Sequence, residues 1–235
     1  MVRSVGVTRG RRAAEVWSLL VVTLLIWTMF PTNAKAVPPQ NCSNAAYNVE
    51  GSQSTQQGNH QGVRGDVDFP TPNNECARVS SIAVLSGSGN GVVEWGWQLG
   101  WYTICDSAYA SSPRLFMLNK PNNGVIVCTT HASLGTPGFR NLLLADGNSD
   151  TIWDAKLNGN PITNANVNFD RGTLVTNGER DCTCDSAFSH FKALKFQVAG
   201  SATWFAWSSA VLFVDNDPGF KWTKLSETAH KVEAG

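Results

Sequence analysis

From about residue 62 onward, the chain alternates short runs of β-branched and aromatic residues with clusters of Gly, Asn, Pro and Ser. Short apolar runs bounded by turn residues are typical of β-strands. Strands predicted at 80–86 and 92–99 are joined by a hairpin-like connection, GSGNG. Those predicted at 114–118 and 125–129 are joined by a loop that ends in Asn-Gly, a strong turn signal. Further strands are expected at 141–145, 151–157, 167–169, 173–176, 194–198 and 203–214.

Short strands at this spacing predict an all-β fold, a two-sheet antiparallel β-sandwich of the jelly-roll or concanavalin-like kind. We assign it to residues 62–223, as one domain in which Asp66 and Asp68 support a loop. Residues 37–61, rich in Pro, Gln, Asn, Ser and Gly, are expected to be a flexible lead-in. Helix candidates occur only at 186–190 and in the C-terminal tail, 224–235, which lacks a wide apolar stripe and is expected to fray.

The first 36 residues have the pattern of a cleavable signal peptide. Four arginines precede an uncharged apolar run at 16–30, and Ala34-Lys35-Ala36 provides a small-residue cleavage site before Val37. The alternative is an uncleaved anchor, but a spanning helix needs roughly 20 apolar residues and this run is shorter. We therefore expect a secreted, extracellular protein that is free of the membrane after cleavage.

Cleavage changes the charge balance, because the whole chain is formally neutral and its first 36 residues hold five basic residues and one acidic residue. The mature chain then carries a net charge of −4. It has no basic stripe or Lys/Arg-rich segment, so nucleic acid is not expected as a partner.

All six cysteines follow the predicted cleavage site, and an even number in an exported chain favours three disulfides. Spacing alone does not select the pairing. We favour Cys105–Cys128, because these two residues flank one apparent strand pair. The alternative, a metal-binding pair in Cys182-Thr183-Cys184, lacks both the usual spacing and a second ligand pair, so no metal site is expected. The full set is Cys42, Cys76, Cys105, Cys128, Cys182 and Cys184.

The strand predicted at 92–99 separates side chains by face. Alternation places Glu94, Gly96 and Gln98 on one face, and Trp95 and Trp97 on the other face, toward the core. A glycine in the middle of a strand weakens it unless something approaches the backbone closely, as a ligand or substrate would. The other interpretation is the solvent-facing side of an edge strand with a bulge at the glycine.

Two short motifs resemble those of glutamic peptidases. The run EWGW at 94–97 resembles the E-x-G-W strand of neprosin-type peptidases and the Q-x-G strand of fungal eqolisins. The run NGE at 177–179, followed by an aromatic-rich stretch, is similar to the eqolisin segment opened by N-A-E-W. The chain departs from these families where Arg180 replaces the tryptophan, and it does not reproduce the neprosin cysteine signature.

The resemblance implies a β-sandwich with a catalytic pair on its concave face. Glu179 would be the general base that activates water, and Glu94, protonated at low pH, would polarise the scissile carbonyl group. Gln98 would be a helper donor beside the substrate, which crosses at Gly96. The resemblance further implies a polypeptide substrate, activity in acid, and no metal or organic cofactor.

The rival hypothesis is a secreted binding module without catalysis, whose partner is an extracellular glycan or another surface ligand. Seven tryptophans follow the predicted cleavage site, and an exposed indole can stack on a sugar face. A peptidase needs Glu94 and Glu179 side by side, whereas a glycan binder needs a coplanar pair of exposed indoles. His131 is a further candidate for the rim of the site, and the sequence has no G-x-S-x-G nucleophile motif.

Overall fold

The computed structural model divides the chain into two compact units, Met1–Val37 and Pro38–Gly235, and the described residues all belong to the second unit. They are 50–53, 58–70, 78–88, 90–102, 105–180, 188–212 and 220–234. Side chains are not described for 50–53, 101–102, 106–111, 179–180, 188, 212, 220 and 232–234. The predicted signal peptide and most of the predicted lead-in lie outside this set.

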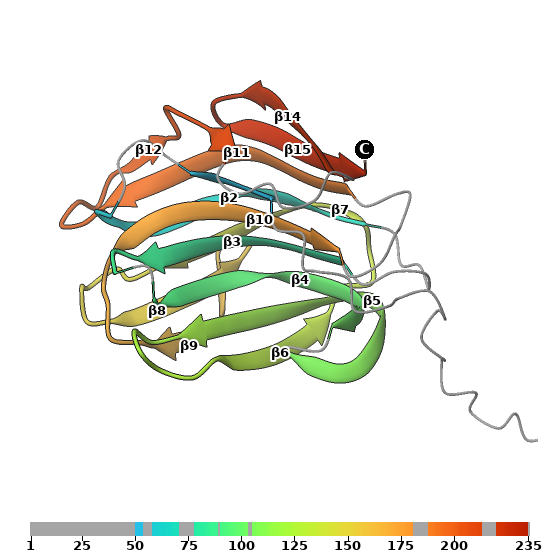
Figure 1. The fold of residues 1–235 in the computed structure, drawn as a ribbon, viewed down its shortest axis with the longest axis horizontal. Coiled ribbons are helices and arrows are strands. Elements are labelled where there is room, and N and C mark those ends of the chain that lie inside the picture. The colour runs from blue at the N-terminus through green and yellow to red at the C-terminus, as the bar shows by residue number, and fades with distance from the viewer. Residues whose placement is uncertain are drawn as a thin grey trace, which may run out of the picture. The chain divides into compact units, whose positions relative to one another are not determined.

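The described residues form β-strands and no helix, in one continuous antiparallel ladder of 15 strands that folds into two layers, the front sheet and the back sheet. The front sheet follows the order β13-β1-β10-β3-β4-β5-β6, and β10, β3, β4 and β5 lie one below another in the view (Figure 1). These strands are β13 (Val211–Leu212), β1 (Glu50–Gln53), β10 (Gly172–Arg180), β3 (Arg78–Ser86), β4 (Val92–Tyr102), β5 (Asp106–Lys120) and β6 (Val127–Ser133).

The back sheet follows the order β14-β15-β11-β2-β7-β8-β9, with β12 added to β11. A single residue pair, His60 with Gly172, makes its ladder continuous with that of the front sheet. The strands are β14 (Phe220–Ser226), β15 (Ala229–Ala234), β11 (Phe188–Val198), β2 (His60–Phe69), β7 (Gly138–Ala145), β8 (Ile152–Leu157), β9 (Asn160–Asn166) and β12 (Trp204–Ala206). The predicted antiparallel β-sandwich is confirmed.

Tryptophans hold the two sheets together. Trp95 and Trp97 on β4 are fully buried, as the alternation of this strand predicts. Each donates its indole N–H across the core to a backbone carbonyl of the back sheet, Trp95 to Lys156 at 3.1 Å and Trp97 to Asp68 at 2.8 Å. A buried indole needs a partner for its N–H group, and here the partner belongs to the opposite sheet.

The loop expected around Asp66 and Asp68 is wrong, because both residues lie in β2, between β11 and β7. Val63, Val67 and Phe69 on the same strand are fully buried, and the two aspartates alternate with them at half-buried positions. The run VRGDVDF is thus a strand pattern of period two, in which the charged residues occupy the outer face.

Two further expectations differ from the structure. The strand predicted at 167–169 is wrong, and the preceding residues form β9 instead. β9 pairs only with β8, and Ala165 is its one buried residue, so its sequence lacks the apolar run of an interior strand. The C-terminal tail does not fray or form a helix: it contributes to the hairpin β14–β15, which pairs with β11. A strand, β1, also lies inside the segment expected to be a lead-in.

The predicted disulfide between Cys105 and Cys128 is confirmed, with 4.7 Å between the two Cα atoms. It joins the residue before β5 to the edge strand β6, and the other four cysteines lie outside the described residues. Within the described ranges, no cluster of three His, Cys, Asp or Glu residues is arranged to hold a metal ion. The same part of the chain contains no helix that is long and apolar enough to span a membrane.

Candidate functional site

The strand that carries the candidate catalytic residues, β4, lies in the interior of the front sheet between β3 and β5. The edge-strand interpretation is therefore wrong, and the register with β5 shifts only after Gln98, so no bulge occurs at Gly96. Glu94 and Gln98 share the face that the alternation predicts. They are 7% and 1% exposed, so this polar face is buried rather than solvated.

The carboxylate of Glu94 accepts hydrogen bonds from two neighbouring strands. Ser81 on β3 donates its hydroxyl to Oε1 of Glu94 at 2.5 Å. Asn177 on β10 donates from Nδ2 to the same oxygen at 3.2 Å. Burial of a carboxyl group costs free energy unless such donors replace water. The three side chains therefore form one polar cluster inside the sheet.

Gly96 packs against the strand that carries one of these donors. A Cβ atom at this position would lie 2.3 Å from the carbonyl oxygen of Ser80 and 2.5 Å from Cβ of Ser81. These distances are too short for any side chain. The glycine therefore allows strand β3 to pack closely against β4, and the close approach expected at this position is made by β3. Contact between Gly96 and a substrate remains a prediction.

Glu179 belongs to the same face by backbone register. It pairs with Val79 on β3, which in turn pairs with Gln98 on β4. Residues in register on antiparallel strands project to the same face. Glu179 is thus the next residue on this face of β10 after Asn177, whose side chain reaches Glu94. The side chain of Glu179 is not described, and the catalytic pair remains a prediction.

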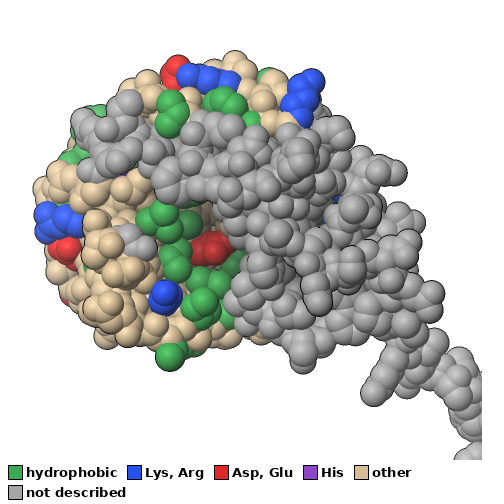
Figure 2. Space-filling model, viewed as in Figure 1, with side chains coloured by type: hydrophobic (Ala, Val, Ile, Leu, Met, Phe, Trp, Pro, Cys, Tyr) green, Lys and Arg blue, Asp and Glu red, His purple; other side chains and the backbone are tan. Residues whose placement is uncertain are grey.

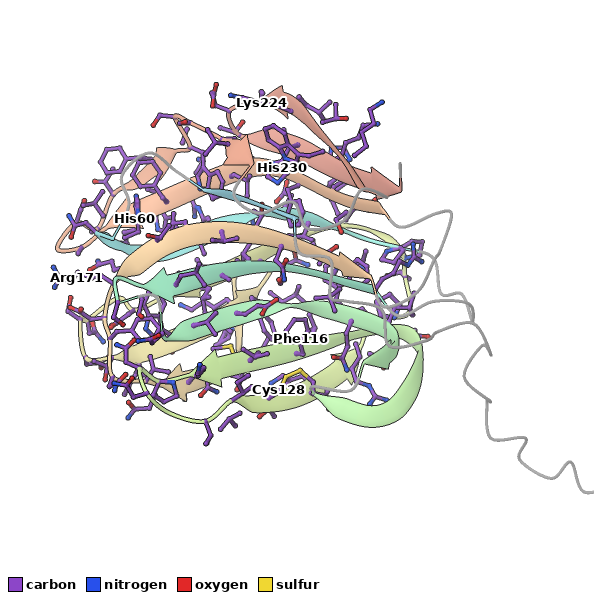
Figure 3. The ribbon with its side chains drawn as sticks, viewed as in Figure 1. His60, Phe116, Cys128, Arg171, Lys224 and His230 are labelled. Carbon is purple, nitrogen blue, oxygen red and sulfur yellow. A yellow bond between two sulfur atoms is a disulfide. The ribbon has the colours of Figure 1, made fainter. Side chains whose placement is uncertain are left out.

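Apolar side chains lie beside the polar cluster on the same face of the front sheet. Val79, Phe116 and Leu118 form a small buried cluster on this face, against which Cys105 and Cys128 pack. Phe116 and Cys128 lie on the neighbouring strands β5 and β6 (Figure 3). In the space-filling view, hydrophobic side chains gather around an acidic one on the visible face (Figure 2).

The amide of Gln98 adds a polar group to this face. Its Oε1 atom is buried and makes no hydrogen bond with the described residues. Arg114 on β5, half-buried, is in register with Gln98, so a guanidinium group belongs to the same row. The row therefore carries an arginine on β5 and an amide on β4, and the backbone of Glu179 on β10 is in register with it.

His131 does not lie at the rim of this site. Its ring packs edge-on against Trp95 at 6.0 Å between centroids, on the core side of the front sheet. Burial lowers the pKa of His131. The sequence reasoning missed Ser81, whose signal was its place in the hairpin opposite Gly96. Asn177 is predicted only as the first residue of the NGE motif, without a role of its own.

The described tryptophans do not form a coplanar exposed pair. Four of them, Trp95, Trp97, Trp153 and Trp207, are buried in the core. Trp204 and Trp222 are half-buried, and the guanidinium group of Arg64 covers the Trp204 ring at 4.7 Å from its centroid. Among residues with described side chains, the expected platform for sugar stacking is therefore missing.

Comparison with solved structures shows the fold of glutamic peptidases. Scytalido-glutamic peptidase, solved with a transition state analogue inhibitor, matches with a TM-score of 0.58 and 11% identity, over 80% of this chain and 98% of that one. SCP-B, an eqolisin solved with the tripeptide Ala-Ile-His, gives 0.53 and 9% over the same shares. A Bacillus licheniformis β-glucanase gives 0.38 and 12%, over 78% of this chain and 67% of that one.

No family model and no curated protein sequence matches the chain. At identities of 11% and 9%, the likeness to the two glutamic peptidases establishes the fold and leaves the chemistry to be argued from the site.

Proposed function

We propose that this protein is a secreted, acid-active endopeptidase of the glutamic type. One observation carries the proposal: a buried glutamate, Glu94, is held by Ser81 and Asn177 on one face of the front sheet. The fold that presents it is shared with two glutamic peptidases. Titratable groups in unusual environments gather at catalytic sites, and a general acid must be held in place beside its substrate, so Glu94 is the candidate acid.

In the proposed reaction, Glu179 removes a proton from a water molecule as its oxygen attacks the carbonyl carbon of a peptide bond. Glu94, protonated, donates to the carbonyl oxygen and stabilises the tetrahedral intermediate, with Gln98 as a second donor. The intermediate collapses when the C–N bond breaks and the proton held by Glu179 passes to the leaving nitrogen. The reaction uses two carboxyl groups and water, and it needs no cofactor.

The test is digestion of a denatured protein substrate by the exported protein at about pH 3–5, where a carboxyl group can be protonated. An inhibitor of aspartic peptidases is added to exclude contaminating activity. Glu94→Ala and Glu179→Gln should each lower the rate by at least about 100-fold, the usual contribution of a general acid or base. Glu227→Gln is the control, because this residue pairs with Lys224 near the β14–β15 turn of the back sheet.

Wild-type activity that survives in both variants would contradict the proposed catalytic pair. A protein that hydrolyses no peptide at any pH, yet binds an extracellular glycan, would contradict the peptidase and support the binding module instead. Glycan array binding of the same preparation distinguishes these outcomes.

A further inference from the structure

Two donors from two different strands converge on one oxygen atom of Glu94. Ser81 is 13 residues away in the sequence and Asn177 is 83 residues away, yet both donate to Oε1. Both donors are buried, at 0% and 5% exposure. Water cannot easily take the place of either donor, so the loss of either hydrogen bond would be costly. Each donor therefore holds the carboxyl group of Glu94 in one orientation.

An oxygen that accepts two donors is a poor position for the acid proton, because that proton would meet the two donor hydrogens. We infer that Ser81 and Asn177 are positioning residues that hold Oε1 of Glu94 as the accepting oxygen, so that Oε2 is the atom that gains and loses the proton. Both bonds strengthen when the carboxyl group ionises, since hydrogen bonds to a charged acceptor are the stronger ones.

The backbone keeps both donors in place. β10, β3 and β4 are consecutive, and Asn177, Ser81 and Gly96 share one row of the ladder. The absence of a side chain at Gly96 lets Ser81 approach β4 more closely than a Cβ atom would permit. Glu94 is the next residue after Gly96 on this face of β4, two positions along the strand. The hydroxyl group of Ser81, opposite Gly96, therefore points along the strand direction toward Glu94.

The consequence for catalysis rests on the proposed function. If protonated Glu94 polarises the scissile carbonyl group, then Oε2 carries the proton that is shared with the substrate. Because Ser81 and Asn177 favour the ionised form, they also limit how far toward neutral pH this proton is retained. The two donors therefore lower the alkaline limit of activity, whereas burial of the carboxyl group raises it.

The first test uses the wild-type protein and does not depend on activity. The carboxyl carbon of Glu94 is followed by 13C NMR as the pH is varied, together with the side-chain amide of Asn177 by 15N NMR. We expect both signals to titrate with one midpoint. An amide signal that stays constant while the carboxyl group titrates would overturn the inference.

The second test compares variants. Ser81→Ala and Asn177→Ala should each move the carboxyl midpoint of Glu94 upward by about one pH unit, because each removes a hydrogen bond to the ionised form. Ser81→Thr keeps the hydroxyl group and should restore the wild-type midpoint. Ser80→Ala is the matched control, because this serine lies on the same strand but bonds to Ser189 in the core.

In an active protein, the alkaline limb of the pH–rate profile should move upward with the carboxyl midpoint. An unchanged midpoint in both alanine variants would overturn the inference even if the protein is a peptidase. A shifted midpoint in a protein without peptidase activity would support the positioning and contradict the proposed function. The two ideas therefore fail separately.

Discussion

At the scale of single residues, Gly96 shows how closely the front sheet packs around the candidate site. Gly96→Ala would place a Cβ atom 2.3 Å from the backbone oxygen of Ser80, which cannot rotate away. We expect β3 and β4 to separate and the free energy of unfolding to fall by about 1–3 kcal/mol, as overpacking usually costs. Urea denaturation measures this loss.

Gly135→Ala is the control for this substitution. Gly135 lies in an exposed loop, and no atom lies within 4 Å of the position where its Cβ would be. Its variant should stay within about 0.5 kcal/mol of the wild type, as surface substitutions usually do. Equal stability of the Gly96 and Gly135 variants would show that the strands can relax without cost.

At the scale of elements, the sequence predicts those strands whose two faces differ most. The faces of β4 are evident, because two tryptophans alternate with a carboxyl group, a glycine and an amide. The edge strand β9 is not evident, because nearly every side chain in it is polar or exposed. The sequence does not single out β2 although its alternation is regular, because Asp66 and Asp68 are expected to support a loop.

The residues of the polar cluster also differ in how far local sequence places them. Ser81 faces Gly96 within one hairpin, so a short connection and a period of two are sufficient to bring it near Glu94. Asn177 comes from β10, which pairs with β3 across a long stretch of sequence. That pairing depends on how the whole sandwich closes, and no local pattern around residue 177 specifies it. The sequence therefore predicts Glu94 and contains a local signal for Ser81, but it does not show that Asn177 joins them.

The disulfide acts at this scale, because it fastens the edge strand β6 to the start of β5. Its cysteines are 23 residues apart, and a cross-link that closes such a loop stabilises a fold by about 3 kcal/mol in the chain-entropy description. Replacement of both Cys105 and Cys128 by serine should lower the stability by that order, measured by urea denaturation. The neighbouring exposed residue Thr129, changed to serine, is the control, and equal midpoints for both proteins would contradict the estimate.

At the scale of the whole molecule, buried histidines link stability to pH. His230 on β15 is 1% exposed, its ring stacks on Phe191, and its Nε2 atom lies 2.8 Å from the hydroxyl oxygen of Thr176. Burial, with a smaller contribution from the charge of His190, lowers the pKa of His230 to about 4. Burial also lowers the pKa of His60, which lies apart from His230 on the back sheet (Figure 3).

The sign of this linkage follows from the two states. In the unfolded chain a histidine binds a proton below about pH 6.5, whereas His230 in the fold stays neutral down to about pH 4. Its contribution to stability is therefore complete above pH 6.5 and is lost as the pH falls toward 4, by about 3 kcal/mol in total. Burial raises the pKa values of Asp68 and Asp146, so these groups act in the opposite direction.

His230→Gln isolates the histidine from these opposing groups. Glutamine does not titrate and can still bond to Thr176, so the loss of stability between pH 7 and pH 4 should be smaller in the variant than in the wild type. Thermal unfolding at intervals across this range measures both curves, and parallel curves would show that His230 does not respond to acid in the folded protein.

An acid peptidase with this core would work in the pH range where the stability of its fold decreases. The variant should therefore remain active longer at pH 4, with an unchanged initial rate, because His230 lies outside the proposed site.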